Sequence, residues 1–230
     1  MRDLDVRSAL RRELKQQHLG GDRTLIVEEM GVWSGTVRVD IAVINGELCG
    51  YEIKSARDNL ERLPAQEALY SQVFDRVTLV VAEQHVAKAE TLVPGWWGRL
   101  IASAEPDGTV ALKLDRPALF NPSIEPLQLA RLLWRPEALS ILQRHGQDRG
   151  VRSASAEKTF RRLACTVPLD TLRQEVREAL KARPAWSGKP VQYEREMAVG
   201  VDLHPLSTSA SAHTGISGDR RNPLVAPTAR

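Results

Sequence analysis

Cysteines and long apolar segments are scarce in this chain of 230 residues. The two cysteines, Cys49 and Cys165, lie far apart and form no CxxC or Cys/His spacing. This spacing argues against both a disulfide framework and a structural zinc site. No run of about eighteen or more apolar residues occurs, and the charged first residues lack the apolar segment of a signal peptide. We therefore expect a cytoplasmic protein that does not associate with membranes.

The formal net charge of +3 hides a difference between the two parts of the chain. Residues 1–105 hold 13 Lys or Arg and 16 Asp or Glu, whereas residues 106–230 hold 19 and 13. An acidic part can hold a cation, and a basic part can hold a polyanion such as nucleic acid. The split suits a protein that combines metal chemistry with phosphate binding, although ordinary surface variation would also produce it.

Helical and extended patterns alternate in the first 105 residues. Apolar residues recur at helical spacing from Leu4 to Leu14, which predicts an amphipathic helix that ends near residues 19–21. Asn45-Gly46 between two β-rich runs predicts a hairpin, and a further helix begins at Pro64 and carries apolar residues as far as Phe74. We expect strands at Thr24–Glu29, Val37–Ile44, Leu48–Lys54, Val77–Ala82 and Gly98–Ser103, with a short helix at His85–Leu92.

This order of elements predicts an α/β fold with a mixed sheet between layers of helices. The β signal disappears from Glu125 onward. We therefore expect an α/β core at residues 1–105, a mostly helical region at 106–186, and a disordered tail at 187–230 whose composition cannot bury enough apolar surface. The helices of the second region are expected at Leu127–Leu133, Glu137–Arg144, Glu157–Ala164 and Leu169–Ala182.

The predicted hairpin carries the chemistry. Glu52 and Lys54 project from one face because side chains alternate along a strand. Asp40 lies on the partner strand among apolar residues, where an unpaired carboxylate would be costly. A divalent cation would compensate two facing carboxylates, and Mg²⁺ prefers oxygen ligands. Because Lys54 could orient or deprotonate an attacking water and offset transition-state charge, the pattern predicts phosphodiester hydrolysis.

These residues resemble the motif of the PD-(D/E)XK nuclease superfamily. Asp40 is followed after eleven residues by Glu52-Ile53-Lys54, on consecutive strands of an αβββαβ series. Gln66 and Tyr70 resemble the QxxxY motif of RecB-like members, which lies on the helix after the third core strand, and their spacing places them on one helical face. The sequence departs from the superfamily name in one respect, because Val39 and not proline precedes Asp40.

The resemblance implies a restriction-endonuclease-like core, and it supplies roles for individual residues. The stretch from Gly50 to Asp75 is also similar to a family of small bacterial and phage proteins without an assigned function. The similarity to this second family extends over residues 1–185, but it does not indicate a substrate, because the family has no assigned function. The resemblance to the nuclease superfamily places Asp40, Glu52, Lys54, Gln66 and Tyr70 in the active centre. It also implies that Asp40, Glu52 and the main-chain carbonyl of Ile53 are ligands of Mg²⁺ or Mn²⁺.

Further charged residues flank the proposed centre. Glu29 is a candidate for an additional metal ligand and Glu28 is its rival, and strand alternation should send their side chains to opposite faces. Arginines and lysines suit phosphate contacts, and a basic helical module would suit nonspecific DNA binding. Solvated surface charges would look the same. The candidate nucleic-acid contacts are Arg38, Arg57 and Arg62 near the centre and Lys158, Arg161 and Arg162 in the helical region.

The sequence therefore predicts a Mg²⁺-dependent nuclease that acts on DNA, as an endonuclease in a repair, phage or defence context. Two alternatives stay open: a nuclease fold without catalysis that docks DNA or a protein, and a nuclease directed at RNA. The helical region at 106–186 could equally cap the core or bind a protein partner or a second copy of the chain.

Overall fold

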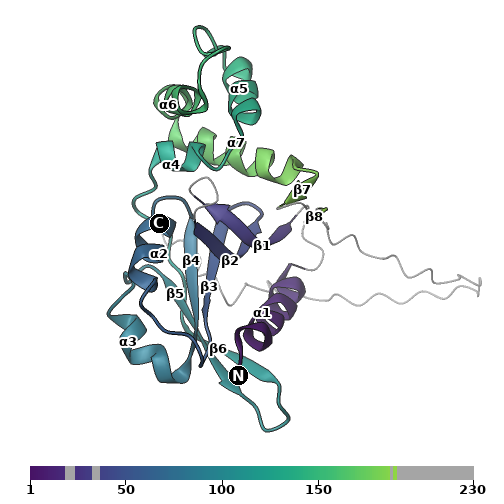
Figure 1. Cartoon of the computed structure of the whole chain (residues 1–230), viewed down its shortest axis with the longest axis vertical. Helices are drawn as coiled ribbons and strands as arrows, with labels where there is room; N and C mark the ends of the chain where they lie inside the picture. Colours follow the sequence, from purple (N-terminus) through teal and green to yellow (C-terminus); the bar gives the residue numbers. More distant parts are fainter. Residues whose placement is uncertain (19–23, 33–36, 187–188, 191–230) are drawn as a thin grey trace, which may run out of the picture.

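The described part of the chain is built on a six-stranded mixed sheet (Figure 1). The computed structural model describes residues 1–18, 24–32, 37–186 and 189–190, so nearly all of the tail expected at 187–230 lies outside the described residues. The strands lie in chain order, with parallel pairs only at β3–β4 and β4–β5. They are β1 Leu25–Val32, β2 Val37–Ile44, β3 Leu48–Lys54, β4 Arg76–Ala82, β5 Gly98–Ala104 and β6 Val110–Arg116.

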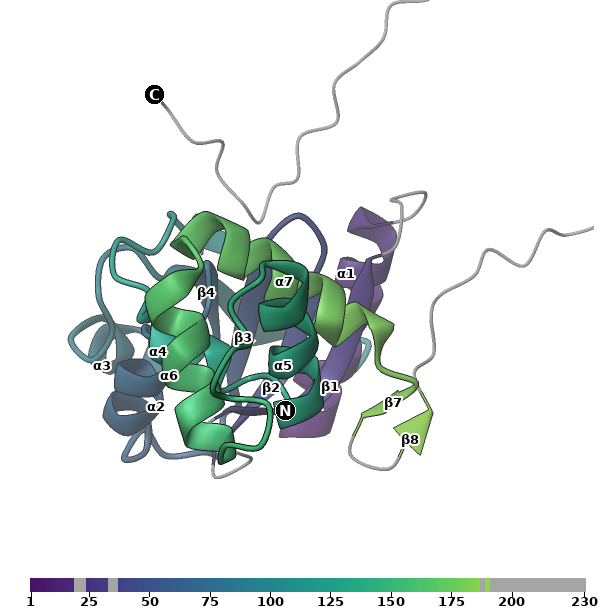
Figure 2. The same ribbon diagram turned by 90° about the horizontal axis from the view of Figure 1, so that it is seen from above.

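Helices cover both faces of the sheet (Figures 1 and 2). α1 (Asp3–Gln17) packs on one face through Val6, Leu10 and Leu14, which recur every fourth residue and so form one apolar stripe. Residues of the other helices join a larger apolar core on the opposite face. These helices are α2 Leu63–Tyr70, α3 Val86–Glu90, α4 Pro126–Ala130, α5 Arg135–Arg144, α6 Ala156–Thr166 and α7 Leu169–Ala182, and the 3₁₀ turn η1 (Glu83–His85) precedes α3.

The predicted hairpin is confirmed as β2 and β3. The side chain of Asn45 accepts a hydrogen bond from the main-chain N–H of Glu47 at 2.9 Å, which closes the turn. The register pairs Ile41 with Tyr51, so Asp40 and Glu52 follow immediately at the end of the paired segment. Every residue of β3 is buried, because helices pack on both faces of this central strand.

β6 was not predicted, and it extends the sheet beyond residue 105, where the expected α/β core ends. A turn at residues 105–109 joins it to β5, with Gly108 in the left-handed region at φ 84°. As an edge strand it exposes Lys113 and Asp115, and such charges discourage pairing with other chains. Because these charges interrupt a short apolar run, the strand is difficult to recognise from its sequence.

The helices of the second region form near the predicted positions, although α4 ends at Ala130 and not at Leu133, and in the core both α2 and α3 are shorter than expected. α2 ends at Tyr70, so Val73 and Phe74 are buried in the segment that follows it and are not part of its apolar side. The main-chain N–H of Phe74 donates to the carbonyl of Tyr70, which closes the last turn before β4. Among the described residues, no helix has the length and apolarity needed to cross a membrane.

α7 ties the helical region to the sheet. Leu172, Val176 and Leu180 are fully buried in the core shared with the strands. Asp75, which is 2% exposed, accepts a hydrogen bond from the main-chain N–H of Leu48 and lies 3.2 and 3.5 Å from the guanidinium groups of Arg173 and Arg177. Burial raises the pKa of Asp75, while the Leu48 bond and both arginines oppose that shift.

We expect Asp75→Asn to lower the free energy of unfolding by about 3 kcal/mol, because it removes the buried negative charge that two largely buried guanidinium groups share. Asp170→Asn is the matched control, since Asp170 pairs with the same Arg173 but is 94% exposed, and it should change stability by less than about 0.5 kcal/mol. Urea denaturation measures both values. Equal effects of the two variants would contradict the role of Asp75 as the anchor of α7.

Candidate active site

Glu52 is the centre of a polar network on the face of the sheet that α2 covers. Its side chain is 3% exposed. Its Oε1 accepts from Lys54 Nζ at 2.5 Å and from Gln66 Nε2 at 2.6 Å, and its Oε2 lies 2.9 Å from Tyr70 Oη. Lys54 Nζ also donates to Gln66 Oε1 at 2.9 Å. Four of the residues predicted for the active centre are therefore in direct contact.

α2 presents Gln66 and Tyr70 on one face because they are four residues apart. Tyr70 is fully buried and stacks on Trp97 with ring centroids 6.2 Å apart, which fixes its ring. Its hydroxyl lies 2.7 Å from the main-chain oxygen of Arg38 as well as 2.9 Å from Glu52. The single hydroxyl proton can be donated to one of these two acceptors at a time. Tyr70 thereby links β2 to β3.

The environment of Glu52 raises its pKa to about 7, first through burial and then through the negative charge of Asp40, against the opposing effects of Lys54 and Tyr70. The two carboxylates of the predicted centre are thus close enough to influence each other. Burial and the charge of Glu52 also raise the pKa of Tyr70, which keeps the phenol protonated. Glu52 can therefore gain or release a proton near neutral pH.

Arg7 on α1 binds Asp40, a contact that no pattern in the sequence indicates. Arg7 Nη2 donates to Asp40 Oδ1 at 2.7 Å and Nη1 to the main-chain oxygen of Asp40 at 3.0 Å. Asp40 Oδ2 accepts from the main-chain N–H of Ile53 at 2.7 Å. Burial lowers the pKa of Arg7, but Asp40 and Asp3 outweigh it and raise the pKa overall. Arg7 follows the buried Val6 in an ordinary amphipathic pattern, so only the packing of α1 reveals its partner.

The expectation that Glu28 and Glu29 point to opposite faces was wrong, because β1 is irregular there. Glu29 has φ 53°, a left-handed conformation that is rare outside glycine, and it is not paired with Asp40, although the register is the same on either side, at Glu28–Ile41 and Met30–Val39. Glu28 pairs with Arg11 at 2.9 Å and Glu29 with Arg7 at 3.0 Å, so both carboxylates reach α1. Glu29 therefore shares a guanidinium group with Asp40.

The residues fit a divalent cation in part. Asp40 and Glu52 offer the carboxylate oxygens that Mg²⁺ prefers, and they lie on paired strands, where Asp40 accepts a hydrogen bond from the main-chain N–H of Ile53, the residue after Glu52. However, each of their four oxygens already has a hydrogen-bond or ion-pair partner. Within the described ranges, no group of three or more His, Cys, Asp and Glu residues is arranged to hold a metal ion. A cation at this site would compete with the positive charge of Arg7 at Asp40 and of Lys54 at Glu52.

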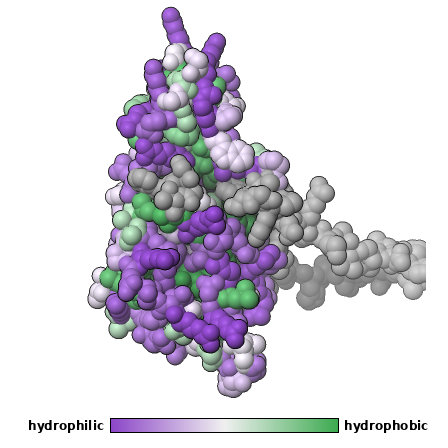
Figure 3. Space-filling model, viewed as in Figure 1, coloured by the Kyte–Doolittle hydropathy of each residue, from purple (hydrophilic) through white to green (hydrophobic). Residues whose placement is uncertain are grey.

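The basic residues predicted to contact nucleic acid lie in two places. Arg38, Arg57 and Arg62 are exposed, and the last two line a pocket of about 360 Å³ together with Lys54. Lys158, Arg161 and Arg162 lie on α6, which packs against α4, α5 and α7. The end of the molecule that holds α5 and α6 is largely hydrophilic (Figure 3). The role of these six basic residues in binding nucleic acid stays a prediction.

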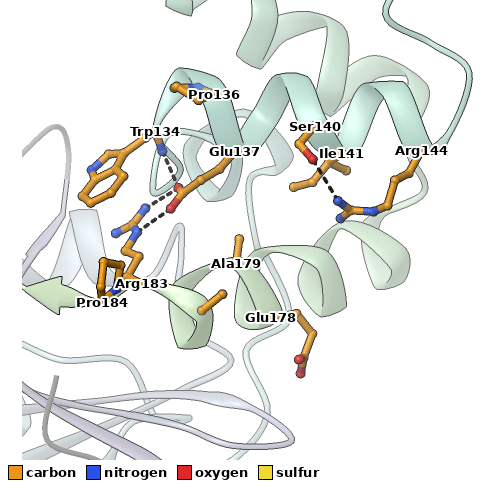
Figure 4. Close-up of a pocket in the computed structure, with 11 residues that line it drawn as sticks. Trp134, Pro136, Glu137, Ser140, Ile141, Arg144, Glu178, Ala179, Arg183 and Pro184 are labelled. Carbon is orange, nitrogen blue, oxygen red and sulfur yellow. Dashed lines mark hydrogen bonds and ion pairs between the residues drawn. The ribbon is translucent and has the colours of Figure 1, made fainter.

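A second pocket, of about 590 Å³, lies between α5 and α7 (Figure 4). Trp134, which is 54% exposed, forms one wall, and the guanidinium of Arg183 lies 4.4 Å from the centre of its ring. Arg183 also donates to both carboxylate oxygens of Glu137 at 2.8 and 2.6 Å, which holds the cation under the indole. The pocket lies in the region where a protein partner or second copy is predicted.

The raised pKa of Glu52 predicts a specific dependence of stability on pH. Since the folded pKa of about 7 exceeds the usual 4.5, the unfolded state loses this proton first, and stability falls as pH rises from about 4.5 to about 7. The loss is on the order of 3–3.5 kcal/mol, at about 1.4 kcal/mol per pKa unit. Glu52→Gln removes the titrating carboxyl group and with it this dependence on pH. In EDTA, the free energy of unfolding of the variant minus that of wild type should therefore be higher near pH 8 than near pH 5. The same difference at both pH values would refute the assignment.

Comparisons with known proteins place the chain in a family. The protein described as Protein cII of Enterobacteria phage P4 is 34% identical over 146 residues, which cover 64% of this chain and 54% of that protein. The chain thus spans about half the length of this relative. The structure of Pyrococcus furiosus SfsA in complex with Ca²⁺ is 15% identical, covers 48% of this chain and 62% of that chain, and has a TM-score of 0.31, too low to support any argument about fold. Residues 2–196 match the family described as Bacteriophage P4 protein cII, and the chain therefore belongs to that family.

Proposed function

We propose that the protein is a metal-dependent nuclease with a restriction-endonuclease-like core of the PD-(D/E)XK type. The observation that carries the proposal is the contact of Glu52 with Lys54, Gln66 and Tyr70, next to Asp40 on the paired strand. A buried carboxylate and ammonium have a high desolvation cost, and such groups cluster where chemistry requires them. DNA is the proposed substrate, and RNA is the alternative.

The proposed chemistry is hydrolysis of a phosphodiester bond. Asp40 and Glu52 would hold Mg²⁺ or Mn²⁺, with the main-chain carbonyl of Ile53 as a further ligand, and the ion when bound would polarise the phosphate and acidify water. Gln66 and Glu52 orient the ammonium of Lys54, since both accept hydrogen bonds from it. Lys54 would offset the charge that builds on the phosphate oxygens during attack. Tyr70 holds the second oxygen of Glu52 in place.

Cleavage of supercoiled plasmid in the presence of Mg²⁺ or Mn²⁺ tests the proposal. We expect wild type to nick the plasmid, and Asp40→Asn and Lys54→Met to reduce the rate by about a thousandfold or more, since each removes a group that acts on the transition state. Glu67→Gln is the control, because Glu67 lies on α2 beside Gln66 but bonds Ser71 and not Glu52. RNA and single-stranded DNA are tested in parallel. A folded wild type without activity on any of these substrates would refute the proposal.

A second candidate function is a nuclease fold without catalysis that docks DNA or a protein. The observation that favours it is Arg7, which already supplies Asp40 with a positive charge and joins it to Glu29. With Lys54 on Glu52, both carboxylates of the centre have a cationic partner from the chain itself. Such a site is electrostatically satisfied without a metal ion.

Arg7→Gln separates the two candidates. If Asp40 and Glu52 form a metal site, removal of the competing guanidinium should tighten Mn²⁺ binding in calorimetry by about tenfold, in proportion to roughly 1.4 kcal/mol of lost competition. Arg11→Gln, one turn further along α1 and paired with Glu28, should leave Mn²⁺ binding unchanged. A docking module would bind no Mn²⁺ in wild type or in either variant.

A further inference from the structure

We infer that the pocket in the loop between β3 and α2 binds a backbone phosphate of a polynucleotide, adjacent to the phosphate that reacts. The inference rests on the proposed function for its choice of a polynucleotide as the source of the phosphate. The pocket measures about 360 Å³ and is lined by Lys54, Arg57, Asp58, Asn59, Glu61 and Arg62. It contains one residue of the proposed catalytic network and two arginines that the network does not use.

Arg57 and Arg62 differ from the arginines that hold the fold together. Arg7, Arg76 and Arg99 each pair with a carboxylate and are largely buried. The guanidinium groups of Arg57 and Arg62 are exposed and have no hydrogen-bond or ion-pair partner among the described residues. A guanidinium group that is not neutralised by the protein can donate two parallel hydrogen bonds to a phosphate.

The loop that carries these arginines has a fixed backbone. Asp58 accepts at 2.7 Å from both the main-chain N–H and the hydroxyl of Ser55, and Leu60 is 3% exposed in the core. Gln84, beyond the end of β4, donates to the carbonyl of Ala56 at 2.9 Å and fastens the loop to the neighbouring strand. A phosphate therefore meets two guanidinium groups on a preorganised frame, which reduces the entropy lost on binding.

Lys54 connects the pocket to the buried centre. Its ammonium bonds Glu52 and Gln66, and the residue also lines the pocket. A strand held in the pocket by Arg57 and Arg62 would lead its next phosphate towards Lys54. Of the two acids in the lining, Asp58 is occupied by Ser55, whereas the exposed Glu61 opposes a bound phosphate by like-charge repulsion.

Fluorescence anisotropy with a labelled DNA duplex, in EDTA and at several salt concentrations, tests the inference without requiring cleavage. We expect Arg57→Ala/Arg62→Ala to weaken binding by at least about tenfold at low salt and to reduce the slope of log K against log salt by about two, roughly one per phosphate contact. Glu61→Gln should tighten binding. Lys88→Ala/Lys113→Ala removes two exposed charges from α3 and β6, and it should leave the slope unchanged.

Each result decides the question independently of nuclease activity. A double arginine variant that binds DNA with the salt dependence of wild type overturns the inference, even if wild type cleaves plasmid. A wild type that binds no DNA in EDTA also overturns it. Binding of inorganic pyrophosphate is measured for the same proteins. If Arg57→Ala/Arg62→Ala loses pyrophosphate binding but keeps DNA binding, the pocket binds free phosphate compounds, and the inference of a polynucleotide site is overturned. Reduced DNA binding and salt slope would support the site even if no cleavage were found.

Discussion

Burial of the Glu52 carboxylate is the constraint on which the arrangement of the site depends. β3 is covered on both faces, and an ionised group there is stable only if hydrogen bonds and opposite charge replace its lost hydration. Lys54, Gln66 and Tyr70 supply these partners, and two of them come from α2. The position of α2 on the sheet, the stacking of Tyr70 on Trp97 and the rigidity of the loop before α2 all serve to hold that one carboxylate.

The sequence predicted the parts of this arrangement that are encoded locally. Strand alternation places Glu52 and Lys54 on one face, and helical spacing places Gln66 and Tyr70 together, so their meeting required only that α2 pack on β3. The bounds of β2, β3 and α7 were predicted to the residue, because each is marked by an uninterrupted period or a turn signal. The assignment to the nuclease superfamily came from resemblance and stays a proposal.

What the sequence could not predict depends on contacts between distant segments. Arg7 and Asp40 are 33 positions apart, and Asp75 meets Arg173 across nearly a hundred residues, so neither pair has a local signature. The backbone conformation of Glu29 is a second feature that the local sequence does not predict. Alternation is a rule for regular strands, and the left-handed residue in β1 turns Glu29 towards α1 together with Glu28. A single irregular residue is thus enough to bring two neighbouring side chains to the same helix, against the alternation that the sequence predicted.

The charges around Asp40 show how one site could serve with or without a divalent cation. Arg7 pairs with Asp3 at 3.2 Å and Glu29 at 3.0 Å in addition to Asp40, and both of these partners are nearly half exposed. If Arg7 left Asp40, its guanidinium would keep two carboxylates and access to water, so the exchange would not strand a buried positive charge. Asp40 would retain the Ile53 N–H and need only one new cationic partner. Because Arg7 has three acidic partners and Asp40 has one cationic partner, replacement of the guanidinium by a divalent ion would cost the fold little, whereas the loss of Lys54 from the enclosed Glu52 would cost it much more.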